Sequence, residues 1–180
     1  MPFKVLDRDL GWSDFVKGVA KMHDAQVAVG ILDDGEKYPD GDLSIAEVGA
    51  IQEFGTEDGH IPARSFLRET FDEQRDALDM LARLYAQRIL FAKSTPEDAM
   101  NALGATLAAA IKKRIAAGID PPNAESTALA KAARGKTAKF FRRPARNLGE
   151  ALAQVGALAA VKPLVDTGRL LNAITWAVES

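Results

Sequence analysis

The residues from Leu67 to Gly118 carry two long helical patterns in succession, and these constrain the fold more than any other feature of the sequence. In both, apolar residues recur at steps of three and four residues or sums of these steps. The first pattern runs to about Ala92; the second begins at Pro96, after Thr95 as its cap, and ends at Gly118. The apolar positions are Leu67, Phe71, Leu78, Leu81, Tyr85 and Ile89, then Met100, Leu103, Leu107, Ile111 and Ile115.

Alternating patterns near the two ends of the chain predict β-strands. Val27–Ile31 alternates larger and smaller residues and is followed by the turn residues Asp33-Asp34-Gly35. Ile174–Glu179 alternates in the same way, which predicts a closing strand with Trp176 inside the core. The sequence therefore predicts one α+β domain over residues 1–180, with a small, mainly antiparallel sheet covered by the two long helices.

Local capping signals predict shorter helices. Ser44-x-x-Glu47 is a capping box before an apolar series, so a helix is expected from Ile45 to Phe54, with Gly55 as its left-handed cap. Asp166 or Thr167 is expected to cap another short helix. The buried face of that helix would carry Leu170, Leu171 and Ile174. Two more short helices are expected at 13–22 and 124–133.

Three strings in fixed order carry a resemblance to a known family. They are LSIAEVGAIQEFGTEDGHIPARSFLRETF (43–71), GIDPPNAESTALAKAA (118–133) and KPLVDTGRLLNAI (162–174). Together they resemble the tail-completion and virion-morphogenesis family of tailed double-stranded DNA phages, which includes proteins described as minor tail protein Z. The resemblance runs from about Val27 to the C-terminus, with a variable insertion expected at 135–161. The matching positions are Glu53, Phe54, Gly55, Pro62, Arg64, Phe66, Pro122, Asn123, Thr127, Lys131, Pro163, Leu164, Asp166, Thr167, Gly168 and Leu170.

The resemblance implies a structural role. A member of this family would be a virion protein at the neck or the head-proximal end of the tail, required for tail completion and head–tail joining. It would form a ring of identical subunits, with six copies as the expected number. Its neighbours would be tail terminator, tail tube or head-connector proteins, and virion DNA in the channel is a further candidate partner. Assembly would take place in the cytoplasm of the host bacterium.

A basic run is the one functional candidate that charge alone nominates. Between Lys131 and Arg146 the chain has seven basic residues and no acidic one, although the formal net charge of the whole chain is −2. Three interpretations remain open: contact with a neighbouring protein, contact with DNA as an assembly factor, and a solvated loop. An extension ordered by assembly is expected here. The candidate residues are Lys131, Arg134, Lys136, Lys139, Phe140, Phe141, Arg142, Arg143 and Arg146.

The residues needed for catalysis or metal binding are scarce. There is no cysteine, and the two histidines, His23 and His60, lack the spacing of a zinc site. No glycine-rich phosphate loop and no calcium loop can be found. The sequence thus predicts a protein that is not an enzyme and has no cofactor and no metal. No apolar run approaches the length of a membrane span and no leader is evident, so no membrane partner is expected.

Overall fold

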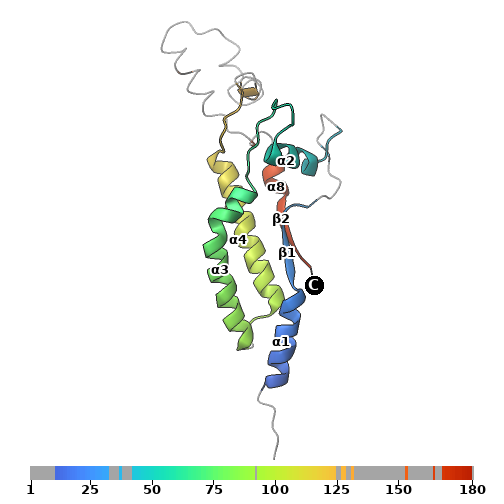
Figure 1. Cartoon of the computed structure of the whole chain (residues 1–180), viewed down its shortest axis with the longest axis vertical. Coiled ribbons are helices and arrows are strands. Elements are labelled where there is room, and N and C mark those ends of the chain that lie inside the picture. Colours follow the sequence, from blue (N-terminus) through green and yellow to red (C-terminus); the bar gives the residue numbers. More distant parts are fainter. Residues whose placement is uncertain are drawn as a thin grey trace, which may run out of the picture.

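The computed structural model describes residues 11–32, 37, 42–91, 93–124, 127–128, 131, 153, 164 and 168–179. The chain is α+β, as predicted, with helices and a two-stranded antiparallel sheet (Figure 1). None of the helices in this part of the chain is long and apolar enough to cross a membrane. The elements are α1 (Trp12–Asp24), β1 (Gln26–Ile31), α2 (Ile45–Phe54), α3 (Arg68–Leu90), α4 (Pro96–Ala117), α8 (Arg169–Ala173) and β2 (Ile174–Glu179).

The sheet joins the two ends of the fold. Strands β1 and β2 pair so that Val29 lies opposite Trp176 and Ile31 lies opposite Ile174. Because opposed residues share a face, the larger side chains of both strands lie on the same side of the sheet. Helix α4 packs against both strands, and α3 packs against α4 (Figure 1). The prediction of two long helices over the sheet is therefore confirmed with one refinement. Helix α4 packs directly on the sheet, whereas α3 packs mainly on α4.

The core lies where α4, β2 and the start of α3 meet. Phe66, Ile111, Ile115 and Ile174 are each at most 1% exposed. The most buried side of α4 does not coincide with the predicted apolar stripe but is rotated around the helix and includes small residues. Small residues are needed there because the sheet lies close to the helix. At Gly104 an added Cβ would lie 2.6 Å from Cδ1 of Trp176, which leaves no room for a side chain. The buried positions of α4 are Ala99, Gly104, Ala108, Ile111 and Ile115.

The prediction that Trp176 lies inside the core is wrong. Its side chain lies over Gly104 at the edge of the contact between α4 and β2, and the residue is 37% exposed. The indole Nε1–H donates a hydrogen bond to Oδ1 of Asn101, at 3.1 Å. A tryptophan with one apolar side and one polar atom is well suited to such a half-covered position. Ile174, two residues earlier in β2, is buried as expected.

Helix ends follow the capping signals with two exceptions. The capping boxes of Ser44 with Glu47 and of Thr95 with Asp98 are both formed, and α4 ends before Gly118 at φ 100°. At Gly55 φ is 76° as expected of a cap, but ψ is extended instead of left-handed helical. The residue at the N-cap position of α8 is Gly168, at φ 77°, and not Asp166 or Thr167 as expected; those two residues lie outside the described part of the chain.

The remaining helix predictions are met in part. The helix expected at 13–22 is α1, which extends from Trp12 to Asp24. Within the helix expected at 124–133, the described residues Thr127, Ala128 and Lys131 are helical. The insertion expected at 135–161 lies outside the described residues except for Ala153.

Candidate functional site

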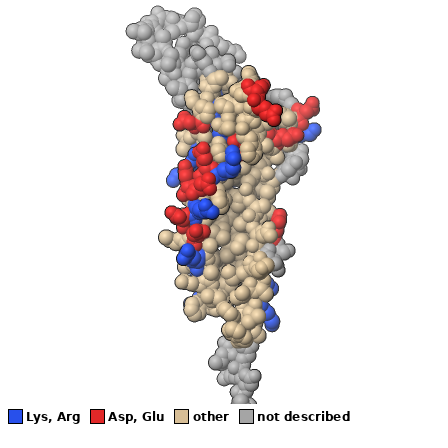
Figure 2. Space-filling view, viewed as in Figure 1, with Lys and Arg blue, Asp and Glu red and all other residues tan. Residues whose placement is uncertain are grey.

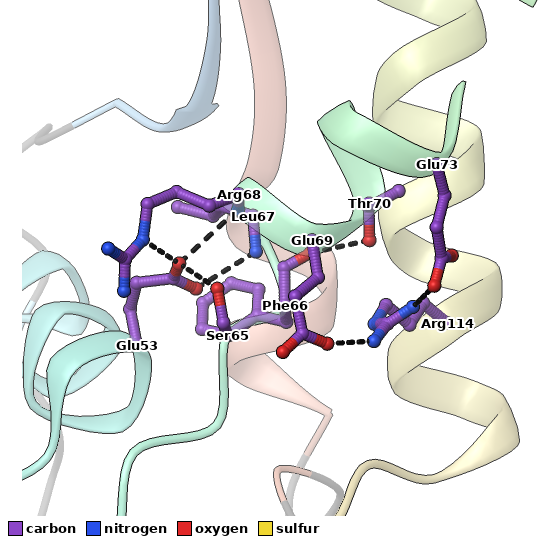
Figure 3. A network of polar contacts seen from close by, with 9 residues as sticks. All are labelled: Glu53, Ser65, Phe66, Leu67, Arg68, Glu69, Thr70, Glu73 and Arg114. Atoms are coloured by element: carbon purple, nitrogen blue, oxygen red, sulfur yellow. Dashed lines mark hydrogen bonds and ion pairs between the residues drawn. The ribbon is translucent and has the colours of Figure 1, made fainter. Parts of the chain in front are cut away.

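Glu53 links the end of α2 to the start of α3. Helix α3 has no capping side chain of its own at Leu67. The Glu53 carboxylate, only 2% exposed, takes that place: it accepts hydrogen bonds from the backbone N–H groups of Leu67 (2.9 Å) and Arg68 (3.3 Å) (Figure 3). It also accepts from the Ser65 hydroxyl at 2.7 Å and from Nε of Arg68 at 3.0 Å. The acidic residue before Phe54 is thus an N-cap supplied by another helix.

These hydrogen bonds decide the protonation state of Glu53. Burial alone would raise the pKa of its carboxyl group, but the donors from Leu67, Ser65 and Arg68 outweigh burial and lower the pKa. Glu53 is therefore ionised at neutral pH, as a cap for helix N–H groups should be. Arg68 also lies over the ring of Phe54, 4.8 Å from its centroid, where Phe54 is 65% exposed.

Arg64 ties the loop before α3 to the Pro121–Pro122 loop after α4. Its side chain is buried, with Nε donating to the carbonyl of Pro121 at 2.8 Å and Nη2 donating to that of Pro122 at 3.0 Å. A third bond runs from Nη1 to Oε1 of Gln52, at 3.2 Å. Burial lowers the pKa of Arg64, which remains charged. One guanidinium thereby holds three segments together through acceptors that carry no net charge.

The loop between α2 and α3 folds back onto Gly55. The Arg64 N–H donates to the carbonyl of Gln52 at 2.7 Å, and the Thr56 N–H donates to that of Ile61 at 3.0 Å. A Cβ at Gly55 would lie 2.8 Å from Ala63 N and from Ile61 O, both backbone atoms. The positive φ and this close approach both require glycine.

A hollow of about 400 Å³ lies at the end of the fold formed by α2, α8 and the loop after α4. Every lining residue within the described part of the chain belongs to one of the three strings identified in the sequence. The first string contributes six residues, and the second and third contribute four each. They are Val48, Gln52, His60, Ile61, Pro62 and Arg64, then Asn123, Ala124, Thr127 and Lys131, and finally Leu164, Gly168, Arg169 and Leu170.

The structure thus brings together most of the described motif residues. Pro62, Arg64, Asn123, Thr127, Lys131, Leu164, Gly168 and Leu170 line the hollow. Glu53, Gly55 and Pro122 hold its walls by the contacts above, and Phe66 is fully buried in the core behind them. Leu164 has a φ of 61°, a backbone conformation that bulky residues rarely adopt. Pro163, Asp166 and Thr167 lie outside the described residues.

The basic run is represented here only by Lys131. The other candidates, Arg134, Lys136, Lys139, Phe140, Phe141, Arg142, Arg143 and Arg146, lie outside the described residues. The described residues that flank residues 132–163 in the sequence are Lys131 and Leu164, and both line the hollow. Within that segment, Ala153 is the one described residue. The two described residues that flank this segment in the sequence therefore lie at the same hollow.

Sequence reasoning missed several residues of the site. Gln52 supports Arg64 with both its side chain and its backbone carbonyl, yet nothing in the local pattern of α2 distinguishes it. His60 was considered only as a metal ligand, whereas it lines the hollow. Ser65 and Arg68 complete the Glu53 cap. Only the three-dimensional fold shows these partners, because each acts on a residue twelve or more positions away or in another segment.

The described residues do not form a metal centre. No group of three or more His, Cys, Asp or Glu side chains within them is placed to hold a metal ion. The lining of the hollow is instead a mixture of apolar side chains, amides, a hydroxyl and basic groups. Such a surface can contact another molecule through apolar packing and hydrogen bonds.

Comparisons with known proteins found no relatives. A scan against protein-family models, a search of curated proteins and a search of solved structures each gave no match to this chain.

Proposed function

We propose that this chain is a structural protein of a tailed-phage or prophage virion. It would occupy the neck or the head-proximal end of the tail, complete the tail, and make it competent to join the head. It would act by binding, as a subunit of a ring with six copies expected, and not by catalysis. Its final location would be the virion, after assembly in the host cytoplasm.

One observation carries this proposal. The three strings that resemble the tail-completion family are separated by tens of residues in the chain, yet all fourteen described residues that line the hollow come from them. If the three strings matched the family only by chance, their residues would have no reason to line the same hollow. Many large apolar side chains are also exposed, among them Phe54, Met80 and Phe91 at 65%, 74% and 73%. Surfaces of this kind commonly contact other proteins.

A substitution in the hollow tests the proposal. Thr127 is exposed and lines the hollow, so Thr127→Tyr should fill part of it while leaving the fold intact. We expect an unchanged melting temperature, heads and tails that assemble separately, and a strong loss of joined particles. Thr106→Tyr, at an exposed threonine of α4 outside the hollow, is the matched control and should support normal particle yield.

Particle composition tests the location directly. Mass spectrometry of purified virions should detect the chain, at a copy number that matches the symmetry of the tail. Particles that lack the chain, although assembly requires it, would instead identify a scaffold or chaperone. The alternative function, a DNA-binding assembly factor that uses residues 131–146, predicts salt-sensitive DNA binding by the isolated protein.

A further inference from the structure

Helix α3 has a second line of contact positions, on its exposed side. Steps of four and three residues alternate along it from Glu73 to the C-cap residue Phe91, which is the heptad spacing of a coiled-coil seam. At about 100° per residue, these positions fall within an arc of about 80°. The exposed fractions of its large apolar residues Met80, Leu84 and Phe91 are 74%, 51% and 73%. The α3 seam, as we call this line, consists of Glu73, Ala77, Met80, Leu84, Gln87 and Phe91.

The α3 seam is separate from the face of α3 that packs within the chain. That inner face carries Leu78, Leu81, Tyr85 and Ile89, which are buried or half-buried. Its centre lies about a third of a turn around the helix from the centre of the seam. One apolar face is enough for a helix that covers only its own core, whereas α3 has two. Exposed apolar surface of this kind commonly marks a contact with another protein.

The charges of α3 are segregated along its length. Residues 68–79 contain five acidic and two basic residues, whereas residues 80–90 contain two basic residues and no acidic one. Figure 2 shows acidic and basic side chains gathered in a column over α3. The helix dipole favours such segregation only in the first and last turns, so it does not explain charges near the middle of the helix. Two α3 helices packed in opposite directions would bring the acidic half of each beside the basic half of the other.

One register satisfies both the seam and the charges. In an antiparallel pair centred midway between Ala77 and Met80, each Met80 packs against Ala77 of the other copy, and the two helices overlap along nearly their whole length. In the same register, Asp76 of one copy and Arg83 of the second copy lie within about 3 Å of each other along the axis. These two residues are about 20° apart around the helix, on the same flank of the seam. In an antiparallel pair related by a two-fold axis, like flanks meet.

Asp76 and Arg83 are both available for this contact. Both residues are exposed, and neither side chain forms an ion pair within the described part of the chain. They lie about 10 Å apart along their own helix, which is too far for them to pair with each other. A second copy of this chain supplies the missing opposite charge to both residues at once. This complementarity favours a second copy as the occupant of the seam.

We infer that α3 of one copy packs antiparallel against α3 of a second copy along the α3 seam. The contact is isologous, because both copies use the same surface about a two-fold axis. An isologous contact makes a pair and cannot close a ring by itself. It is therefore additional to the ring contact of the proposed function, and the free chain is a dimer.

Single aspartate substitutions on three exposed surfaces locate the contact, with light scattering and sedimentation of the full chain as the measurements. The wild-type chain should be a dimer. Met80→Asp, at the centre of the seam, should be a monomer with an unchanged circular dichroism spectrum. Val16→Asp is the matched control on α1, where Val16 is 47% exposed, and Ala82→Asp is the control on the opposite side of α3, in the groove between α3 and β1. Both controls should dimerise like the wild type.

Charge reversal tests the predicted ion pairs. Asp76→Arg alone, or Arg83→Asp alone, would place like charges together at both pairs, so each should raise the dimer dissociation constant about tenfold at low salt. An equimolar mixture of the two variants should regain the wild-type affinity, because each variant supplies the charge that the other lacks. The differences should shrink as the salt concentration rises. Arg75→Asp, on the opposite side of α3, is the matched control and should not change the affinity.

Cysteine cross-linking determines the direction of the two helices, since the chain has no cysteine of its own. Glu73 of one copy and Leu84 of the other lie at the same height in the antiparallel register, but about 16 Å apart along the axis in a parallel pair aligned in register. Glu73→Cys mixed with Leu84→Cys should therefore give an oxidised heterodimer. Neither variant alone should cross-link to itself, because its two cysteines would be too far apart for a disulfide.

The opposing outcomes are equally definite. A wild-type chain that is monomeric at high concentration, or a Met80→Asp variant that dimerises like the wild type, would overturn the inference. Leu84→Cys that cross-links to itself and not to Glu73→Cys would assign a parallel pair and also overturn it. None of these results bears on whether the chain is found in virions, so failure of this contact and failure of the proposed function can be told apart.

Discussion

Glu53 and Arg64 are the two charged residues that the described part of the chain buries most completely. Both use their charge on other segments: Glu53 receives two N–H groups at the start of α3, and Arg64 donates to two carbonyl groups of the loop after α4. Burying a charge without such bonds would cost several kcal/mol, so each residue depends on the segments it holds. The wall of the hollow that Arg64 forms is therefore held to the loop after α4 by hydrogen bonds to the backbone.

Glu53 gives the first prediction at this scale, on pH and stability. Its folded-state pKa lies below the ordinary value of 4.5. The ionised carboxylate therefore stabilises the fold fully above that value, and the contribution is lost as the pH falls through the lower folded-state pKa. Glu53→Gln should lower the free energy of unfolding by about 2 kcal/mol at neutral pH. The variant should also lose less stability than the wild type on acidification.

Urea unfolding measured from neutral pH down to pH 3 checks both expectations. Glu57→Gln is the control, since Glu57 is an exposed acid on the following loop. It should match the wild type at every pH. Equal acid sensitivity of the Glu53→Gln variant and the wild type would mean that this carboxylate does not cap α3.

At the scale of the element, sequence patterns predicted the secondary structure of each segment better than the packing between segments. Capping boxes at Ser44 and Thr95 and the glycine stop at Gly118 located helix ends closely, because caps depend on neighbours within four residues. The position of Trp176 and the rotation of α4 were missed. Periodicity shows which residues share a face, but how closely two faces approach depends on a glycine, Gly104, in a different element.

The candidate site shows the same division. The resemblance to the tail-completion family pointed to residues in three separate strings, and the fold places eight of these residues around one hollow. Their convergence could not be derived from the sequence, because it depends on long-range bonds such as those from Arg64 to Pro121 and Pro122. Gln52 carried no signal at all, since its role exists only once Arg64 is placed against α2.

The contact between α4 and the sheet provides a prediction with a matched control. Gly104→Ala would place a methyl group 2.6 Å from the Trp176 ring and 2.9 Å from Val27. Overpacking of about 1–3 kcal/mol should exceed the gain of about 1 kcal/mol in helix propensity, so the variant should be less stable. Gly18→Ala in α1 meets only Ile89, at an ordinary 3.7 Å, and should be neutral or stabilising.

Thermal unfolding of the two alanine variants, with Trp176 fluorescence as a local probe, separates these effects. Gly104→Ala should shift the emission because the methyl group displaces the indole. If both glycine variants raised the melting temperature equally, α4 and β2 would not be in the close contact described.

For the whole molecule, the distribution of charge says more than its total. The seven basic residues between Lys131 and Arg146 leave 16 basic and 25 acidic residues on the rest of the chain. A copy of this protein is therefore acidic outside the run, so in the proposed ring the surface of one subunit would attract the run of its neighbour. DNA in a phage channel would attract it as well. The apolar pair Phe140-Phe141 inside the run favours protein, since adjacent aromatic side chains can anchor such a contact.

The last prediction separates these partners by replacing Lys136, Lys139, Arg142, Arg143 and Arg146 with Gln. If the run binds protein, tail joining should fail, while DNA retention in particles already joined should not change. If it binds DNA, the isolated wild-type chain should bind DNA with an affinity that falls by nearly one unit of log–log slope for each phosphate neutralised, and the variant should lose that dependence. Particle yield and infectivity count joined particles, and gel shifts at increasing salt measure the affinity. Normal yield and infectivity with the five glutamines would exclude both partners and leave a solvated segment, because neither contact could then be required for assembly.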